Sequence, residues 1–228
     1  MSSEAIEGHH GAAAAVHDED LHHQFEDMAQ QNDAYVVGMW TFLVTEVMFF
    51  GALFLAYLVY RRMFPAAFVE AHEELNVTLG TVNTLVLLTS SLSMAMAVYF
   101  AQIRQRVKSM GCIAFTMLCA ITFLVVKGFE WKAKFESHHV PGFAFKWTGQ
   151  TPTGQAEMFF NLYFAMTGLH ALHVIIGIGI MAVLLVLMKM DHKAVRYYMP
   201  IEMTGLYWHF VDIVWIFLFP LFYLIPKH

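Results

Sequence analysis

The sequence predicts an all-α integral membrane protein built as a bundle of five transmembrane helices. Hydrophobic residues make up 58% of the 228 residues and charged residues only 14%, whereas a soluble domain carries about 25% charged residues. Five long apolar runs hold almost no charge, and each exceeds the roughly 20 residues that a helix needs to cross a bilayer. None of the runs alternates with the period of two that a membrane-spanning β-strand requires.

The first 34 residues differ in composition from everything that follows. They contain eight acidic residues and neither lysine nor arginine. No basic start precedes an apolar run, so the segment lacks the pattern of a signal peptide. This composition predicts a solvated, mostly disordered tail, in which 18–34 is the part suited to a short helix at the membrane surface. Five histidines are interleaved with the acidic residues: His9, His10, His17, His22 and His23.

The remaining residues, 35–228, form the predicted membrane domain. Its spans are expected at about 35–60, 75–103, 109–131, 158–188 and 203–226. Glu46 is the only charge in the first span, the second has none, and the third is free of charge until Lys127 and Glu130. The fourth is long enough to require tilt or an extension into water. The fifth is interrupted only by His209 and Asp212.

The connections between the spans bear on neighbours and orientation. Short loops at 61–74 and 104–108 predict antiparallel neighbours, and the longest connection covers about 132–157. If the N-terminus is cytoplasmic, the inner loops 104–108 and 189–202 hold six basic residues, and the longer outer segments also hold six. The higher density of basic residues in the inner loops favours a cytoplasmic N-terminus and a C-terminus on the opposite face.

Polar side chains at membrane depth are costly, so each is a candidate functional residue. The candidates are Glu46, Asn83, Glu130, His170, His173, His209 and Asp212. Glu46 lies about 16 Å into its span at 1.5 Å per residue, which is near the midplane. The two candidates of the fourth span, and the two of the fifth, are three residues apart and share a helix face. Lys127 and Glu130 have the same spacing, which predicts an ion pair.

Three interpretations fit these residue types and spacings. One is a metal or di-metal site built from Glu46 and the paired candidates of the last two spans, since helix bundles build metal sites from facing histidines and carboxylates. The second is a proton or ion relay of the kind found in transporters. The third is structural, with the histidines and the aspartate of the last two spans bonding to one another across helices. His-x-x-His without a carboxylate motif is a weak metal signal.

Five short motifs follow one another along the spans. They are Trp40-Thr-Phe-Leu-Val-Thr-Glu46-Val-Met-Phe-Phe50, Asn83-Thr84 with Leu87-Leu88-Thr-Ser-Ser91, Glu130-Trp131, Thr167-Gly168-Leu-His170-Ala-Leu-His173, and Tyr207-Trp208-His209-Phe210-Val-Asp212-Ile-Val-Trp215. The series resembles subunit III of the haem–copper cytochrome c oxidases, helix by helix over residues 40–215. Longer members of that family have seven helices, and this chain begins at the third of them. It therefore resembles the short five-helix bacterial form.

The resemblance implies a non-catalytic core subunit of a proton-pumping aerobic terminal oxidase of the aa3 type. Such a subunit binds no haem, copper or other metal, and those cofactors are expected in partner subunits. Its buried Glu and His residues are expected to serve packing, bound phospholipid and the proton uptake of subunit I. The implied partners are mainly subunit I, then subunit II and other respiratory complexes, with no nucleic acid. The implied location is the bacterial cytoplasmic membrane, with the C-terminus in the periplasm.

Several alternatives remain beside this interpretation. Two are close relatives: subunit III of a quinol oxidase and the accessory membrane protein of nitric oxide reductases. An independent ion or solute carrier is a third, although an odd helix number without an inverted repeat or a broken helix disfavours it. The tail also has two interpretations. It either keeps the terminus solvated, or its histidines, which exchange protons near neutral pH, form a proton-collecting antenna.

Overall fold

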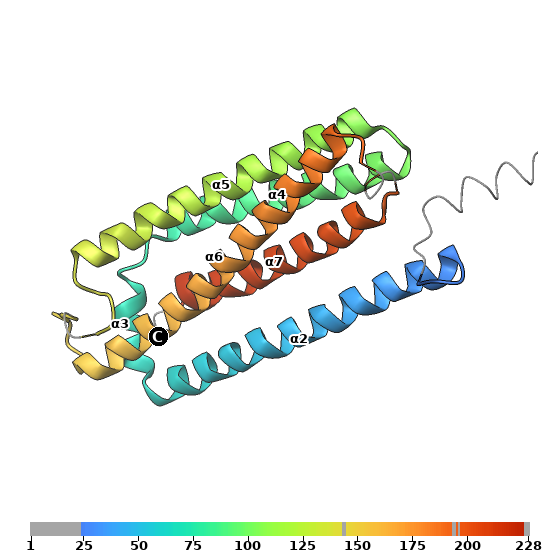
Figure 1. Cartoon of the computed structure of the whole chain (residues 1–228). Coiled ribbons are helices and arrows are strands. Elements are labelled where there is room, and N and C mark those ends of the chain that lie inside the picture. Colours follow the sequence, from blue (N-terminus) through green and yellow to red (C-terminus); the bar gives the residue numbers. More distant parts are fainter. Residues whose placement is uncertain (1–23, 143–144, 193–194, 196, 226–228) are drawn as a thin grey trace, which may run out of the picture.

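A computed structural model describes residues 24–142, 145–192, 195 and 197–225, and every regular element over these residues is a helix (Figure 1). The helices are α2 (Met28–Met63), α3 (Pro65–His72), α4 (Val77–Gln102), α5 (Arg106–Glu136), α6 (Thr153–Lys189) and α7 (Met199–Tyr223). All except α3 are long and apolar enough to cross a membrane. The predicted all-α bundle with five membrane-spanning helices is therefore confirmed. The tail histidines His9, His10, His17, His22 and His23 lie outside the described residues.

Several helices extend beyond the predicted spans. α2 begins at Met28 rather than near 35, because the Asp27 side chain caps it by accepting a hydrogen bond from the Gln30 backbone N–H at 2.7 Å. α5 continues to Glu136, and α6 starts at Thr153. Hydropathy marks where a helix leaves the lipid, whereas backbone hydrogen bonding continues into the polar flanks.

The segment 61–74, predicted as a loop, contains the short helix α3. Pro65 occupies its first turn, where the fixed backbone angle of proline favours a helix start. Three apolar residues of α3, Ala67, Phe68 and Ala71, are completely buried. The Phe68 ring lies edge-on to Phe159 of α6, with ring centres 5.3 Å apart. This burial against α6 stabilises a helix that eight residues alone would not sustain.

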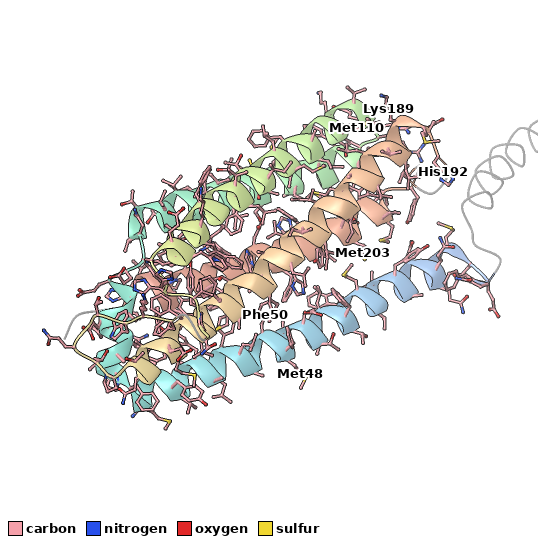
Figure 2. All side chains as sticks on the ribbon, turned by 60° about the vertical axis from the view of Figure 1, so that its left-hand side comes forward. Met48, Phe50, Met110, Lys189, His192 and Met203 are labelled. Atoms are coloured by element: carbon pink, nitrogen blue, oxygen red, sulfur yellow. The ribbon has the colours of Figure 1, made fainter. Side chains whose placement is uncertain are left out.

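α7 is the central helix of the bundle. In its most apolar stretch 56% of the residues are buried, against 17% for α2, and it contacts α2, α4 and α6. α2 runs along one flank (Figure 1). Figure 2 shows Met48 pointing away from the bundle and Phe50 on the side of α2 that faces α6. Accordingly Met48 is 72% exposed and Phe50 only 2%, as expected for a helix with one lipid-facing side.

Glu70 of α3 anchors the beginning of α6. Its carboxylate accepts the backbone N–H groups of Gln150 at 2.5 Å and Thr151 at 2.9 Å. The Thr151 side chain and these two N–H groups hold the pKa of Glu70 below its ordinary value. A depressed carboxyl pKa stabilises the fold above the ordinary pKa, and this contribution is lost as the pH falls through the lowered value.

We expect Glu70→Gln to loosen this anchor at neutral pH, because a neutral amide accepts these bonds more weakly than a carboxylate does. Hydrogen exchange at the amides of Gln150 and Thr151 should become faster in the variant. Wild type should approach the variant only when the pH falls below the lowered pKa of Glu70. Equal exchange rates at neutral pH would contradict the anchor.

Candidate functional sites within the membrane bundle

The first candidate site is a carboxyl–imidazole pair between α2 and α6. Glu46 Oε2 lies 3.2 Å from His173 Nε2, and both side chains are largely buried. His173 Nδ1 lies 2.8 Å from the backbone carbonyl oxygen of Leu169. The Phe50 ring packs edge-on to the imidazole at 5.3 Å, and the Tyr207 hydroxyl donates to the His173 carbonyl at 2.9 Å. Residues from three helices thus fix the position of the pair.

The hydrogen bonds of His173 determine how many protons the pair holds. A carbonyl oxygen only accepts, so Nδ1 must carry a hydrogen, and Nε2 of a neutral ring is then an acceptor. An ionised Glu46 would also be an acceptor, and two acceptors do not bond. The contact therefore requires one further proton, on Glu46 or on Nε2. Two separate charges cost several kcal/mol per ion away from water, which favours the neutral form with the proton on Glu46.

Glu46→Gln provides a test of this proton. The glutamine amide can donate to His173 Nε2 without any extra proton, so the variant should assemble like wild type. Wild type should show the carboxyl stretch of a neutral acid in infrared difference spectra at pH 7, and the variant should lack it. A hydrophobic carbodiimide, which reacts with protonated carboxyls, should modify position 46 in wild type and not in the variant. An ionised Glu46 at pH 7 would contradict the expectation.

The pair also borders a groove between α2, α6 and α7. The groove has a volume of about 410 Å³ and is lined by Met39, Phe42, Glu46, His173, Ile176, Ile180, Met203, Thr204 and Tyr207. Apart from the pair, Thr204 and Tyr207, the lining is apolar. The Thr204 hydroxyl is already bonded to the Pro200 carbonyl at 2.8 Å. An apolar chain with one polar group near mid-depth matches this surface.

A second site joins α5, α6 and α7 around a buried ion pair. Lys127 Nζ lies 2.9 Å from Glu130 Oε2, so the ion pair predicted from their spacing is present. Lys127 also donates to the hydroxyls of Tyr223 at 2.6 Å and Tyr163 at 3.3 Å. Tyr223 donates to the other Glu130 oxygen at 2.5 Å. Lys127 Nζ lies 4.8 Å from the centre of the Trp215 ring, within cation–π range. Protein groups therefore satisfy both charges.

The predicted hydrogen bonds among the histidines and the aspartate of the last two spans are wrong. His173 bonds to Glu46 of α2, and His209 Nδ1 lies 2.7 Å from the Ser91 hydroxyl of α4. His170 does not join these bonds, and Asp212 approaches the same Ser91 hydroxyl as His209 without a hydrogen bond of standard geometry. Positions three apart on a helix differ by about 60° in direction, so His170 faces aromatic rings while His173 faces α2.

His170 and Asp212 are buried without hydrogen-bond partners of standard geometry among the described residues, as is the Oδ1 atom of Asn83. His170 lies between two aromatic rings instead. Its ring centre is 5.5 Å from that of Phe123 and 5.1 Å from that of Trp215. Buried polar groups usually have partners, so these three side chains, from α4, α6 and α7, are exceptions in the bundle interior.

The sequence did not reveal the tyrosine partners of the buried Lys127–Glu130 pair. Tyr163 and Tyr223 had no motif of their own, although a lysine and a glutamate inside a membrane span must find additional polar partners. The indole N–H groups of two tryptophans in α7 likewise bond to polar side chains of another helix. Trp208 donates to the Ser90 hydroxyl and Trp215 to the Thr84 hydroxyl, each at 3.1 Å. Ser90 and Thr84 of α4 thus pair with two tryptophans of α7.

The proposed metal interpretation receives no support from the described part of the chain, where no group of three or more His, Cys, Asp or Glu side chains is placed to hold a metal ion. Glu46 and His173 approach each other, and His209 bonds to Ser91 rather than to another member of the suggested set.

The family model described as cytochrome c oxidase subunit III matches residues 16–226. Cytochrome c oxidase subunit 3 of Synechocystis is 32% identical over 194 residues, covering 85% of this chain and 76% of the relative. Cytochrome bo(3) ubiquinol oxidase subunit 3 of Pseudomonas putida is 30% identical over 190 residues, covering 83% of this chain and 85% of the relative.

A third relative combines two subunits in one chain. The heme-copper oxidase subunit I+III of Aeropyrum pernix is 30% identical over 194 residues. The match covers 82% of this chain but only 22% of that longer protein. The similarity is therefore confined to a part of the fused chain.

The bundle and its buried pairs define a multi-pass helical membrane protein whose polar groups bond mainly to one another across helices. The family model extends over nearly the whole of that bundle. The chain belongs to the cytochrome c oxidase subunit III family of the haem–copper oxidases. This confirms the resemblance found in the five motifs. Members of the family associate with other oxidase subunits in an oxidoreductase complex.

Proposed function

We propose that the chain is the non-catalytic subunit III of a proton-pumping aerobic terminal oxidase of the aa3 type, with cytochrome c as electron donor. The haem and copper belong to partner subunits. The chain flanks subunit I, stabilises it and supports its proton uptake. It also contacts subunit II and larger respiratory assemblies. Supporting observations are the family match and relatives named as cytochrome c oxidase subunit 3 from Synechocystis and from Bacillus subtilis.

The observation that carries the proposal is the Glu46–His173 pair. It requires one proton beyond the neutral imidazole and the carboxylate, and it lies on the outer helix beside a groove. A group of this kind can accept and release a proton without a metal. Its place on the flank of the bundle suits a subunit that assists the proton chemistry of a neighbour. The same groove is the proposed binding place of a phospholipid chain.

The proposed setting is the bacterial cytoplasmic membrane, with residues 1–34 as a cytoplasmic tail and the C-terminus in the periplasm. The positions of two connections between helices support this orientation. The connections α4–α5 and α6–α7 lie at the same end of the bundle as the start of α2 (Figure 1). These are the loops with the higher density of basic residues, and such loops favour the cytoplasmic face.

A quinol oxidase is the second candidate, because relatives named as quinol oxidase subunits are about as similar as those named for cytochrome c. The Pseudomonas putida protein is 30% identical and a probable quinol oxidase subunit 3 of Staphylococcus haemolyticus 29%. The two candidates differ in electron donor and share the supporting role of subunit III.

Purification through a tag on this chain tests the proposal. The chain should bring with it a haem-bearing complex that consumes oxygen with reduced cytochrome c. Turnover with quinol but not with cytochrome c would favour the second candidate. Isolation of the chain alone, without haem, would overturn both candidates and favour the independent carrier.

The tail histidines His9, His10, His17, His22 and His23 are proposed to collect protons for the complex. Histidine side chains exchange protons near neutral pH, and acidic residues are interleaved with these five in the sequence. Deleting residues 1–24 should leave assembly and haem content unchanged and slow turnover most at alkaline pH, where free protons are scarce. If turnover of the truncated complex follows wild type from about pH 6 to pH 9, the tail serves only as a solvated terminus.

A further inference from the structure

A second groove lies between α4 and α5, away from the Glu46–His173 pair. It has a volume of about 470 Å³, within the range of about 300–1,000 Å³ typical of ligand pockets. Its lining residues are Thr89, Leu92, Ser93, Met96, Phe100, Lys108, Gly111, Cys112 and Phe115. Lys108 is its one charged lining residue and lies at the end near the α4–α5 connection.

The length of the groove corresponds to one leaflet of the bilayer. Its lining on α4 runs from Thr89 to Phe100, which is about 16 Å at 1.5 Å per residue. The hydrocarbon core of a bilayer is about 30 Å thick, so one leaflet contributes about half of that. The groove therefore extends from the membrane surface to about the midplane. A lipid acyl chain of one leaflet covers the same distance.

The wall of the groove suits an apolar occupant. The Thr89 hydroxyl donates to the Leu85 carbonyl at 2.8 Å, and the Ser93 hydroxyl donates to the Cys112 carbonyl at 3.0 Å. Both hydroxyls of the wall are thus engaged within the bundle. The remaining lining below Lys108 is apolar apart from the partly buried Cys112 thiol.

The mouth of the groove is positively charged. Lys108 Nζ lies 5.5 Å from the centre of the Phe100 ring, and Arg104 is exposed in the turn just before α5. A third basic residue at this end, Arg106, forms an ion pair with Asp191. Neither Arg104 nor Lys108 belongs to any of the ion pairs found among the described residues. Figure 2 shows Met110 near the same end of the bundle as Lys189, a further basic residue.

We propose that this groove binds one anionic phospholipid, with an acyl chain between α4 and α5 and its phosphate at Lys108 and Arg104. Basic pockets between transmembrane helices bind anionic head groups, and arginine suits phosphate because its planar fork donates two parallel bonds. A zwitterionic lipid fits the apolar wall equally well but gains less from the two cations. The two basic residues select the anionic head group, and the apolar wall of the groove binds the acyl chain.

Gly111 allows the groove to be filled without disturbing the helices. A Cβ atom added at Gly111 would meet no atom within 4 Å, and the same holds for Gly128 of α5. Only Gly111 lines the groove. Gly111→Leu should therefore exclude the lipid chain, and Gly128→Leu is its matched control. To test the role of the positive charge, Lys108→Gln is compared with Lys132→Gln. Lys132 is an exposed lysine at the other end of α5.

The complex is purified through a tag on this chain, exchanged into mixed micelles of detergent and phosphatidylcholine, and titrated with phosphatidylglycerol. Native mass spectrometry should count one retained phosphatidylglycerol fewer in Gly111→Leu than in wild type or Gly128→Leu. Lys108→Gln should lower the preference for phosphatidylglycerol over phosphatidylcholine about fivefold, and Lys132→Gln should leave it unchanged.

A second readout uses the native cysteines. Phosphatidylglycerol should slow alkylation of Cys112, which lines the groove, and leave Cys119 on the same helix unchanged. This measurement keeps the proposal testable if Gly111→Leu fails to assemble. Equal protection by both lipids would overturn it. So would a Cys112 that stays unreactive in every lipid, because another subunit then covers the groove.

Discussion

Replacing Lys127 by methionine is expected to lower the free energy of unfolding by about 3–5 kcal/mol, the range for breaking a buried ion pair by removing one partner. The side chains of Lys127 and Glu130 are only 6% and 5% exposed. Methionine would remove the charged donor of Glu130 and leave it the neutral Tyr223 hydroxyl. Equilibrium denaturation in mixed micelles measures the loss.

Two further variants show whether the loss comes from the uncompensated charge. The double variant Lys127→Met with Glu130→Gln should recover much of the stability, because replacing a whole buried pair is often nearly neutral. Lys132→Met is the matched control on α5, since Lys132 forms a 3.8 Å pair with Glu136 that is mostly exposed. Its cost should stay below about 1 kcal/mol. Equal costs for Lys127→Met and Lys132→Met would contradict the importance of burial.

Gly177→Ala is expected to destabilise the contact between α6 and α7 by about 1–3 kcal/mol, the cost of overpacking a well-packed interior. A Cβ atom at this position would lie 2.8 and 2.9 Å from two ring atoms of Trp208. Trp208 is completely buried and its indole N–H is bonded to Ser90. The rigid ring therefore has little room to move away.

Gly179→Ala tests the same substitution two residues along the helix. A Cβ atom there would meet nothing within 4 Å. Alanine should then stabilise α6 by about 0.5–1 kcal/mol, because glycine is the poorer helix former. The two alanine variants should thus change stability in opposite directions in the same denaturation experiment. Destabilisation by both variants would point to a general intolerance of α6 rather than to the contact with Trp208.

The number and placement of the membrane-spanning helices could be predicted from the sequence, because long charge-free runs have few other structures available in lipid. α3 was not predicted. Eight residues between two spans carry too little periodicity, and its stability comes from the burial of Phe68 against α6, a contact far along the chain. The helix ends at Met28 and Glu136 were also missed, since they depend on caps and polar flanks.

The candidate residues were predicted better than their partners. The polar side chains at membrane depth were visible individually, and the Lys127–Glu130 pair followed from spacing within one helix. Contacts between helices depend on how far each helix is rotated about its own axis and on the angle at which two helices cross. A single sequence reveals neither quantity. The expected bonds among the candidates of α6 and α7 therefore failed. The actual pairs, Glu46 with His173 and His209 with Ser91, connect helices that are distant in sequence.

The pairing of Glu46 with His173 has a consequence for how the chain enters the membrane. The two residues are 127 positions apart, so at roughly 5–20 residues per second the ribosome needs about 6–25 s to supply the histidine. During that interval α2 is in the bilayer with an unpartnered carboxyl. An acid at a helix centre costs about 3 kcal/mol on insertion scales, whereas each Leu, Ile, Phe or Val contributes about 0.3–0.6 kcal/mol in favour. The apolar residues around Glu46 let α2 insert alone, and the pair closes only when α6 has emerged.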